Sequence, residues 1–137
     1  MVDADLVRRK VAELEEYQRQ IEEYHDLTIQ QYRADWKTQR IVDRTLHLMI
    51  ESCLDVANHV IADRRLKVPA TYAETFEVLG EASILSNDLR DAMIRMAGFR
   101  NLLVHEYARV EPGVVVGILR QHLGDFSRFC AAILAAL

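Results

Sequence analysis

The chain has 137 residues, half of them hydrophobic, and contains only 5 glycines and 2 prolines. This length suits one domain with a single core, and so few turn-forming residues argue against a β-sandwich or barrel, which needs a turn about every 8–12 residues. The net charge of -4 comes from residues 1–35, because acidic and basic residues balance over residues 36–137; this excludes a basic protein that coats nucleic acid and leaves any RNA contact to a few local arginines.

The first predicted helix begins at Asp3, which is a good N-cap residue, and carries one amphipathic stripe. Its apolar side chains recur at steps of four and three: Val7, Val11, Leu14, Tyr17, Ile21 and Tyr24. Residues 25–35 are polar and less periodic. We therefore expect a connection with some helical character between this helix and the next.

A long central helix is predicted from residues 35–36 to about Leu66. Its apolar residues keep a strict 4-3-4-3-4 spacing: Val42, Leu46, Met49, Cys53, Val56 and Val60. The dipeptide at residues 68–69 is Val-Pro, and a residue before proline is disfavoured in the α conformation. The central helix should therefore stop shortly before this point.

Three further helices are predicted in the second half of the chain. Residues 71–74 read as a capping box for a short helix that we expect to end at Gly80, a good C-terminal cap. Ser86 begins the next helix, and the Glu-Pro-Gly sequence at residues 111–113 breaks it from a last helix that runs from Val114 to the C-terminus. The sequence thus predicts an all-α protein, an antiparallel bundle of four or five helices in one domain over residues 1–137.

Several other classes of protein are not expected. Cys53 and Cys130 lie in apolar helical patterns and predict reduced core thiols, so we expect a cytoplasmic location. The acidic start and the lack of an apolar run of about 18 residues predict neither a secretory leader nor a membrane contact. Glycine-rich phosphate-binding motifs are missing and the five histidines show no ligand spacing, so we expect no cofactor and no metal.

Polar side chains interrupt an apolar stretch shortly before the break at residues 111–113. Arg100, Asn101, His105 and Tyr107 all lie in this short run. On a straight helix Arg100 and Tyr107 share one stripe, within about 20° of each other, whereas His105 lies about 140° from Arg100. Arg100 and His105 can therefore act together only if the helix loosens before His105 or if a second copy of the chain supplies the missing group.

Arginine and histidine in one cleft suit the cleavage of RNA without a metal. A histidine can deprotonate the 2′-hydroxyl or protonate the leaving oxygen, because its pKa lies near neutrality. An arginine can hold the scissile phosphate and offset the charge that grows in the transition state. We therefore expect Arg100 and His105 to be catalytic, Asn101 to support them, and a 2′,3′-cyclic phosphate to be the product.

Residues 100–107, Arg-Asn-Leu-Leu-Val-His-Glu-Tyr, resemble the R-x4-H-x-Y motif of the HepT branch of the HEPN superfamily. Other residues sit where this branch has them: Trp36, Glu51, Asp55, Asn58, His59, Pro69, Tyr72, Phe76, Met96 and Gly98. The resemblance covers roughly residues 36–130. It implies a HEPN-like helical bundle that forms a homodimer, with the motif at a cleft between the protomers.

The resemblance also implies an endoribonuclease toxin of a toxin–antitoxin system, with RNA and not DNA as its substrate. Its partner would be a minimal nucleotidyltransferase antitoxin that silences the toxin by AMPylation of the motif tyrosine, here Tyr107. Asp55 and His59 lie one helical turn apart. They could line the cleft, although a purely structural hydrogen bond within the helix explains their spacing equally well.

Two other functions fit the same residues. The modest charge favours a non-catalytic helical partner of a nucleotidyltransferase, which presents its substrate or nucleotide. The heptad spacing of residues 42–60 is also typical of a plain helical assembly subunit. In both cases Arg100 would be a surface arginine, His105 a cap near a helix C-terminus and Tyr107 an amphipathic tyrosine at the edge of the bundle.

Overall fold

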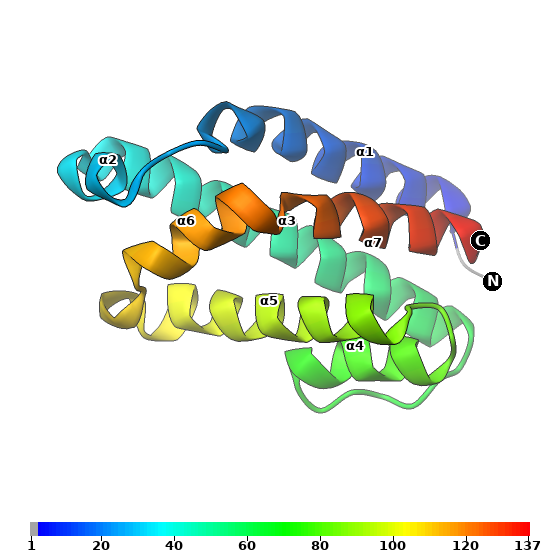
Figure 1. Ribbon diagram of the computed structural model, residues 1–137. Helices are drawn as coiled ribbons and strands as arrows, with labels where there is room; N and C mark the ends of the chain where they lie inside the picture. The colour runs from blue at the N-terminus through cyan, green and yellow to red at the C-terminus, as the bar shows by residue number, and fades with distance from the viewer. Residues whose placement is uncertain (1–2) are drawn as a thin grey trace.

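Four long helices run side by side in alternating directions in the computed structural model, which describes residues 3–137 (Figure 1). They are α1 (Ala4–Ile21), α3 (Trp36–Asp63), α5 (Asn87–His105) and α7 (Leu123–Ala135). Shorter elements join them: α2 (Ile29–Ala34), α4 (Tyr72–Glu81), α6 (Pro112–Gln121) and the 3₁₀ turns η1 (Glu22–Tyr24) and η2 (Tyr107–Arg109). All regular structure in the described part of the chain is helical, which confirms the predicted all-α class.

The α3 helix forms the centre of the bundle and packs against α1, α4, α5 and α7. Its N-terminus is capped by Asp35, which accepts a hydrogen bond from the Lys37 amide at 3.0 Å. The predicted apolar stripe of this helix is buried along its whole length. Each of the seven α-helices contributes side chains to one apolar cluster around it, so burial of this stripe is what holds the bundle together.

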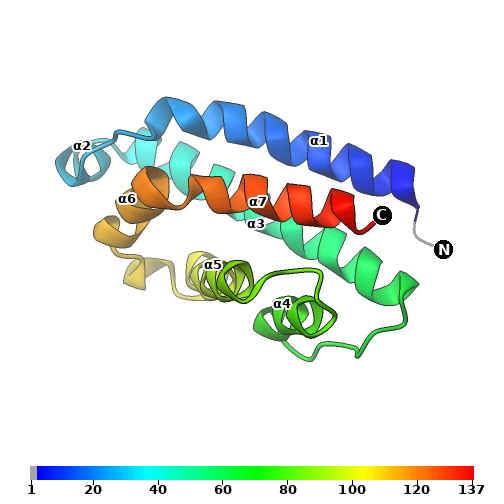
Figure 2. The same ribbon diagram turned by 45° about the vertical axis from the view of Figure 1, so that its right-hand side comes forward.

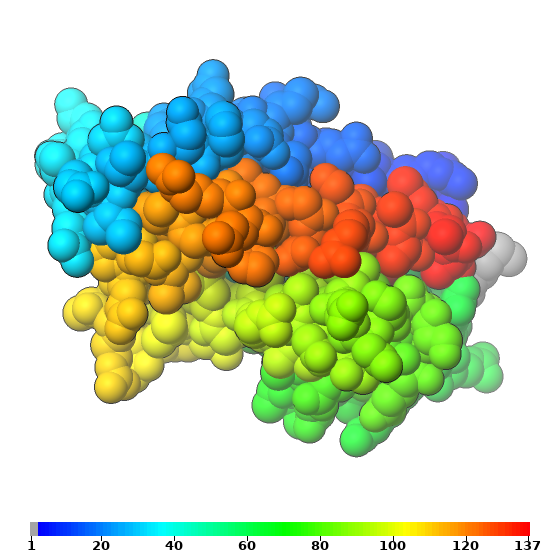
Figure 3. All heavy atoms as spheres, viewed as in Figure 1, coloured from blue at the N-terminus to red at the C-terminus, as the bar shows by residue number. Residues whose placement is uncertain are grey.

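The remaining helices cover the flanks of α3. In the space-filling view α7 lies between α1 and α5 on one face (Figure 3). The turned view looks almost along α4 and α5, which lie next to each other (Figure 2). Near its C-terminal end, α5 therefore has α3 on one side and α4 nearby. The candidate site lies where these helices meet.

The predicted starts of α1, α3, α4 and α5 are confirmed, with one change in detail, whereas the last predicted helix starts at Pro112 and not at Val114. The side chains of Asp3, Thr71 and Ser86 each accept a backbone hydrogen bond from the first turn of their helix. The carboxylate of Glu74 reaches the amide of Ala70, at 2.7 Å, instead of the amide of Thr71. The capping box predicted for α4 is therefore only half formed.

Gly80 does not end α4 as predicted. The helix continues to Glu81, and Gly80 has an ordinary helical backbone. A Cβ atom at Gly80 would lie 2.6 Å from Cδ of Arg90 on α5. The glycine therefore serves the close approach of α4 and α5.

The structure confirms the expected helical character of residues 25–35 and corrects one helix boundary in the first half of the chain. The expected connection at residues 25–35 contains α2, which is started by a reciprocal capping box between Thr28 and Gln31. The α3 helix ends at Asp63 and not near Leu66, because Arg65 adopts a left-handed φ of 53°. The amide of Leu66 then bonds back to the Ile61 carbonyl at 3.0 Å, which closes the helix end.

The predicted last helix is in fact two helices that meet at His122. The backbone there departs from helical values, with φ -125° and ψ 2°. The bend allows α6 to pack on α2 while α7 packs on α1, α3 and α5 (Figure 1). Sequence periodicity did not reveal the bend because the apolar residues Val115, Leu119 and Phe126, all buried, keep a helical spacing across it.

Both cysteines are free and buried in the core, as predicted. Burial raises the pKa of the Cys53 thiol well above its usual value and that of Cys130 to about 11. These thiols are therefore protonated and unreactive at neutral pH. Over residues 3–137, no helix combines the length and the hydrophobicity needed to cross a bilayer.

Replacement of Phe76 by alanine tests how α4 is attached to the bundle. Phe76 is fully buried and meets Phe129 of α7 edge to face, with 5.8 Å between the ring centroids. We expect Phe76→Ala to lower the free energy of unfolding by about 3–4 kcal/mol in urea titrations. Val68→Ala, at a side chain that is 83% exposed, is the control and should change it by less than about 0.5 kcal/mol. Equal effects of the two variants would contradict this packing.

Candidate functional site

Polar side chains form a second stripe on α3, where the C-terminal end of α5 approaches it. The stripe consists of Arg40, Asp43, Arg44, His47 and Glu51. None of these five residues was identified as functional from the sequence, because only the apolar stripe of this helix was followed there. Their spacing of three, four, seven and eleven residues from Arg40 is itself a helical signal that could have identified them.

Arg100 of α5 is held firmly against this stripe. Its Nε donates a hydrogen bond to Oε1 of Glu51 at 2.6 Å. The guanidinium carbon lies 4.5 Å from the ring centroid of Tyr72 on α4. Only 12% of the Arg100 side chain is exposed. A cation is thus fixed in place between three helices, with one remaining contact to Oδ1 of the adjacent Asn101 at 3.3 Å.

Glu51 connects Arg100 to two further basic side chains of α3. Nε2 of His47 lies 3.1 Å from Oε1 of Glu51, and Arg44 contacts Nδ1 of the same imidazole at 3.1 Å. A neutral His47 with its proton on Nε2 satisfies both contacts. Burial opposes ionisation of Glu51, but the Arg100 guanidinium and His47 outweigh it and hold the pKa of Glu51 below its usual value. Glu51 is therefore a carboxylate at neutral pH.

His105 lies away from Arg100 within the same chain. The α5 helix continues without interruption to His105, its last residue. Of the two alternatives drawn from the sequence, the one in which the helix loosens before His105 is therefore wrong. Two side chains five positions apart on such a helix leave its axis about 140° apart. The His105 side chain is exposed, so its imidazole is open to a ligand or to another chain.

Tyr107 does not share a helical stripe with Arg100, contrary to the sequence prediction. The helix ends first, since Glu106 has φ -140° and ψ 49°, and Tyr107 opens the η2 turn. The Tyr107 hydroxyl instead reaches α3, where it donates to Oδ2 of Asp43 at 2.5 Å and accepts from Nη1 of Arg40 at 3.1 Å. The Tyr107 residue as a whole remains 41% exposed.

Asp43 is a buried carboxylate that receives two tyrosine hydroxyls. Tyr32 of α2 donates to its two oxygens at 2.8 and 2.9 Å, in addition to Tyr107. Burial raises the pKa of Asp43, and the hydrogen bonds from both tyrosines oppose that rise. Burial and the neighbouring Asp43 raise the pKa of the Tyr107 phenol. The Tyr107 proton is therefore retained and points at a carboxylate oxygen.

The supporting residue Asn101 and the possible cleft-lining residues Asp55 and His59 line two different hollows. Asn101 lines a polar hollow of about 380 Å³ that includes Tyr72, the ring under Arg100. Asp55 and His59 line another hollow of about 450 Å³ between α1 and α3. Asp55 pairs there with Lys10 of α1 at 3.6 Å. The structure thus brings Asn101 next to Arg100 and places Asp55 and His59 in an adjoining hollow, which shares Asn58 with the first but is lined by none of the motif residues.

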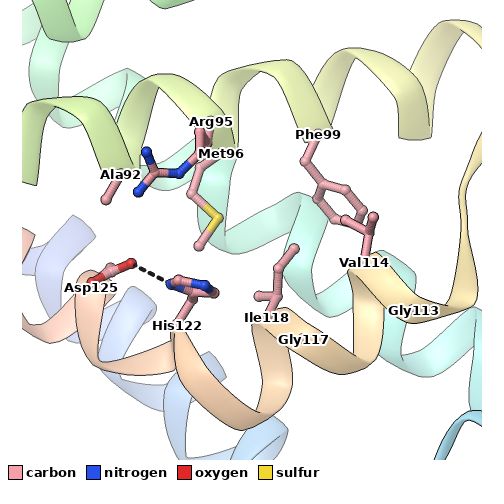
Figure 4. A pocket seen from close by; sticks show the side chains of 10 residues that line it. All are labelled: Ala92, Arg95, Met96, Phe99, Gly113, Val114, Gly117, Ile118, His122 and Asp125. Atoms are coloured by element: carbon pink, nitrogen blue, oxygen red, sulfur yellow. Dashed lines mark hydrogen bonds and ion pairs between the residues drawn. The ribbon is translucent and has the colours of Figure 1, made fainter.

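An apolar hollow of about 260 Å³ lies between α5 and α6 (Figure 4). Met96, Phe99 and Ile118 are among its lining residues, and His122 at its edge contacts Asp125 at 3.3 Å. None of the four motif side chains, Arg100, Asn101, His105 and Tyr107, lines it. The chemistry-bearing residues therefore gather at the contact of α5 with α3 and not at this hollow.

Comparisons with known proteins agree with these features. Residues 14–133 match the family described as ribonuclease HepT-like. The mRNA nuclease HepT of Shewanella oneidensis is 30% identical over 132 residues, which are 96% of this chain and 98% of the relative. Among solved structures, a toxin–antitoxin crystallised with AMP-PNP has a TM-score of 0.89 at 29% identity, over 96% of this chain and 98% of the other.

A second solved structure is equally similar. It is a tri-AMPylated HEPN toxin of Shewanella oneidensis in complex with an MNT antitoxin, with a TM-score of 0.88 at 29% identity over 98% of this chain and 99% of the other. These findings confirm the predicted HEPN-like fold and the predicted enzyme class, that of an endoribonuclease. With its family match over most of the chain and its full-length relative, this chain belongs to the HepT-like ribonuclease family.

Proposed function

We propose that this chain is a metal-independent endoribonuclease toxin of a toxin–antitoxin system, which cuts RNA in a cleft shared by two copies of the chain. Arg100 and His105 are its catalytic residues. The observation that carries the proposal is the uninterrupted course of α5 through both residues. Because the two side chains point in different directions on one helix, a site that uses both is completed by a second protomer.

The two residues have complementary surroundings. Arg100 is fixed by Glu51 and Tyr72, so little conformational entropy is lost when it binds the scissile phosphate. His105 is exposed and is free to reach a ribose hydroxyl. In each site the His105 of one protomer, opposite the Arg100 of the other, takes the proton of the 2′-hydroxyl and passes it to the leaving 5′-oxygen. The product is a 2′,3′-cyclic phosphate.

Nearby groups suit the rest of an RNA strand. The polar hollow beside Arg100 offers the amides of Asn58 and Asn101 to a nucleotide. Arg40 and Arg44 are exposed on the same stripe of α3 and are available to neighbouring phosphates. A protein with a net negative charge thereby obtains the local basic surface that RNA binding requires.

The proposal includes silencing by a minimal nucleotidyltransferase antitoxin, which transfers AMP to Tyr107. The support is the similar Shewanella oneidensis toxin, which is tri-AMPylated and in complex with an MNT antitoxin, together with the exposed Tyr107 at the motif. An AMP group at Tyr107 adds bulk and negative charge close to the RNA site. It blocks the substrate by occupation and by repulsion of its phosphates.

Mixing two inactive variants tests whether the site is shared. We expect Arg100→Ala and His105→Ala each to abolish cleavage of RNA, measured in EDTA so that metal-dependent contaminants are silent. If each site takes one residue from each protomer, half of the dimers in an equal, re-equilibrated mixture have one intact site. Such a mixture should regain about a quarter of the wild-type activity.

Two outcomes would contradict the proposal. A mixture that stays inactive means that both residues act within one chain. Activity that survives in the His105→Ala variant removes His105 from the chemistry. His25→Ala is the matched control, because His25 is also exposed but lies outside the motif, and it should cleave like the wild type.

Neutralisation of Glu51 tests how Arg100 is held. We expect Glu51→Gln to reduce nuclease activity several-fold and to lower the free energy of unfolding by about 1–2 kcal/mol at pH 7, because a charge-assisted hydrogen bond is weakened. The lowered pKa of Glu51 means that its contribution is complete above the unfolded-state pKa of about 4.3 and is lost as the pH falls through the folded-state value.

The stability difference between wild type and Glu51→Gln should therefore shrink below about pH 4, as measured by urea titrations across pH. Glu77→Gln, an exposed change on α4, is the control. A difference that is independent of pH would contradict the ion pair between Glu51 and Arg100.

The proposed modification site is tested by mass. After incubation with the cognate nucleotidyltransferase and ATP, the intact wild-type chain should gain whole AMP units, and Tyr107→Phe should gain none because it lacks the acceptor oxygen. Tyr24→Phe is the control, since Tyr24 is a partly buried tyrosine far along the sequence from the motif. An unchanged mass gain in Tyr107→Phe would place the modification elsewhere.

A further inference from the structure

We propose that Asp43 acts as the general base for the AMPylation of Tyr107 and that Arg40 stabilises the reacting oxygen, so that the toxin supplies part of the machinery of its own silencing. This inference rests on the proposed modification of Tyr107. It states which groups accept the Tyr107 proton and stabilise the Tyr107 oxygen. Without Asp43 and Arg40, the nucleotidyltransferase would have to supply both groups itself.

The hydroxyl proton of Tyr107 already points at Asp43. A phenol has to lose its proton when its oxygen attacks phosphorus, and a base acts only within hydrogen-bond reach of that proton. Oδ2 of Asp43 lies 2.5 Å from the Tyr107 oxygen, which donates to it. No rearrangement of the toxin is needed before the proton can move.

The Asp43 carboxylate is buried and held in a fixed orientation. Its side chain is buried between α2, α3 and the η2 turn, where the neutral form is favoured. The hydroxyl of Tyr32 keeps a donor on the carboxylate throughout, which fixes the carboxylate plane. Asp43 is thus held in a fixed orientation. Its protonation removes a negative charge from a buried site, where that charge is energetically unfavourable.

Arg40 places a positive charge beside the Tyr107 oxygen. Its Nη1 donates to the Tyr107 oxygen at 3.1 Å, and its guanidinium carbon lies 5.4 Å from the Tyr107 ring centroid. The same oxygen therefore has a proton acceptor and a cation beside it. A hollow of about 150 Å³, lined in part by Arg40, Arg44 and Tyr107, leaves room for a phosphoryl group next to both arginines.

The step balances with a nucleoside triphosphate as co-reactant. The O–H bond of Tyr107 breaks and its proton passes to Oδ2 of Asp43. The phenolic oxygen forms a bond to the α-phosphorus of ATP, and the bond from that phosphorus to the bridging oxygen of the β-phosphate breaks. Pyrophosphate leaves with the electron pair, and the new phosphodiester carries one negative charge beside Arg40.

The role of Asp43 is restricted to the first AMP unit. Once Tyr107 carries AMP, its oxygen has no proton left, so a further unit joins a ribose hydroxyl of the AMP already attached. That hydroxyl lies beyond the reach of Asp43. Later additions therefore serve as an internal control for folding and for binding of the partner.

The experiment follows the intact mass of the toxin over time with its cognate nucleotidyltransferase and ATP. We expect Asp43→Asn to slow the first addition at least about 100-fold and to leave later additions unchanged. Arg40→Gln, at an exposed residue, should slow the first addition about 10-fold. Glu13→Gln is the matched control, because Glu13 accepts the Tyr17 hydroxyl at 3.1 Å on the surface of α1, and it should react like the wild type.

Two results would overturn the inference while the proposed function stands. One is a first addition in Asp43→Asn within threefold of the control, and the other is an equal slowing of first and later additions, which indicates weaker partner binding. If Asp43→Asn fails to fold in thermal unfolding, Arg40→Gln decides, and a rate within threefold of the control overturns the inference. A wild-type chain that gains no AMP, or gains it without Tyr107, overturns the proposed function itself.

Discussion

A straight helix cannot present residues five positions apart to the same point, and α5 remains helical from Asn87 to His105. This constraint governs the whole candidate site. Arg100 turns toward α3 and α4, where Glu51 and Tyr72 hold it, while His105 turns outward at the helix end. The motif spacing therefore favours a site built from two chains over one built within a chain, which is the reason for proposing a shared cleft.

Two neighbouring stripes of the α3 helix have different roles. One stripe of α3 is apolar and buried, and it organises the core. The polar stripe beside it carries two adjacent networks. Glu51 and its basic neighbours fix the arginine proposed to bind phosphate, while Asp43 and Arg40 receive the tyrosine proposed to be modified. Because these networks lie within about three helical turns, the proposed silencing and the proposed cleavage of RNA would share one surface.

The sequence predicted what depends on local periodicity and capping. The apolar stripes of α1 and α3, the cap at Asp3 and the helix starts near Asp35 and at Ser86 are present as expected. The helical character expected for residues 25–35 is present as α2, but the start of this helix was not predicted, although the Thr28–Gln31 capping box is legible in the sequence. The break at His122 lacks such a signal, since no side-chain cap starts α7 there and the buried apolar residues keep a helical spacing across it.

The candidate site was predictable only in part, because contacts between different helices leave no signal in the local spacing of residues. Residues 100–107 identify Arg100, Asn101, His105 and Tyr107 by motif alone, but their partners lie on another helix. The α5 helix was expected to carry Tyr107 on the same stripe as Arg100. Because the helix ends at His105, the Tyr107 hydroxyl instead contacts Asp43 of α3. A contact between residues 64 positions apart leaves no trace in local spacing, so a single sequence could not reveal it.

The shared cleft is tested most directly by nuclease activity per chain during dilution, with the oligomeric state followed by sedimentation in the same buffer. The account predicts that activity per chain falls in parallel with the fraction of dimer and returns on reconcentration. Full activity per chain in a sample that sediments as the monomer would contradict it.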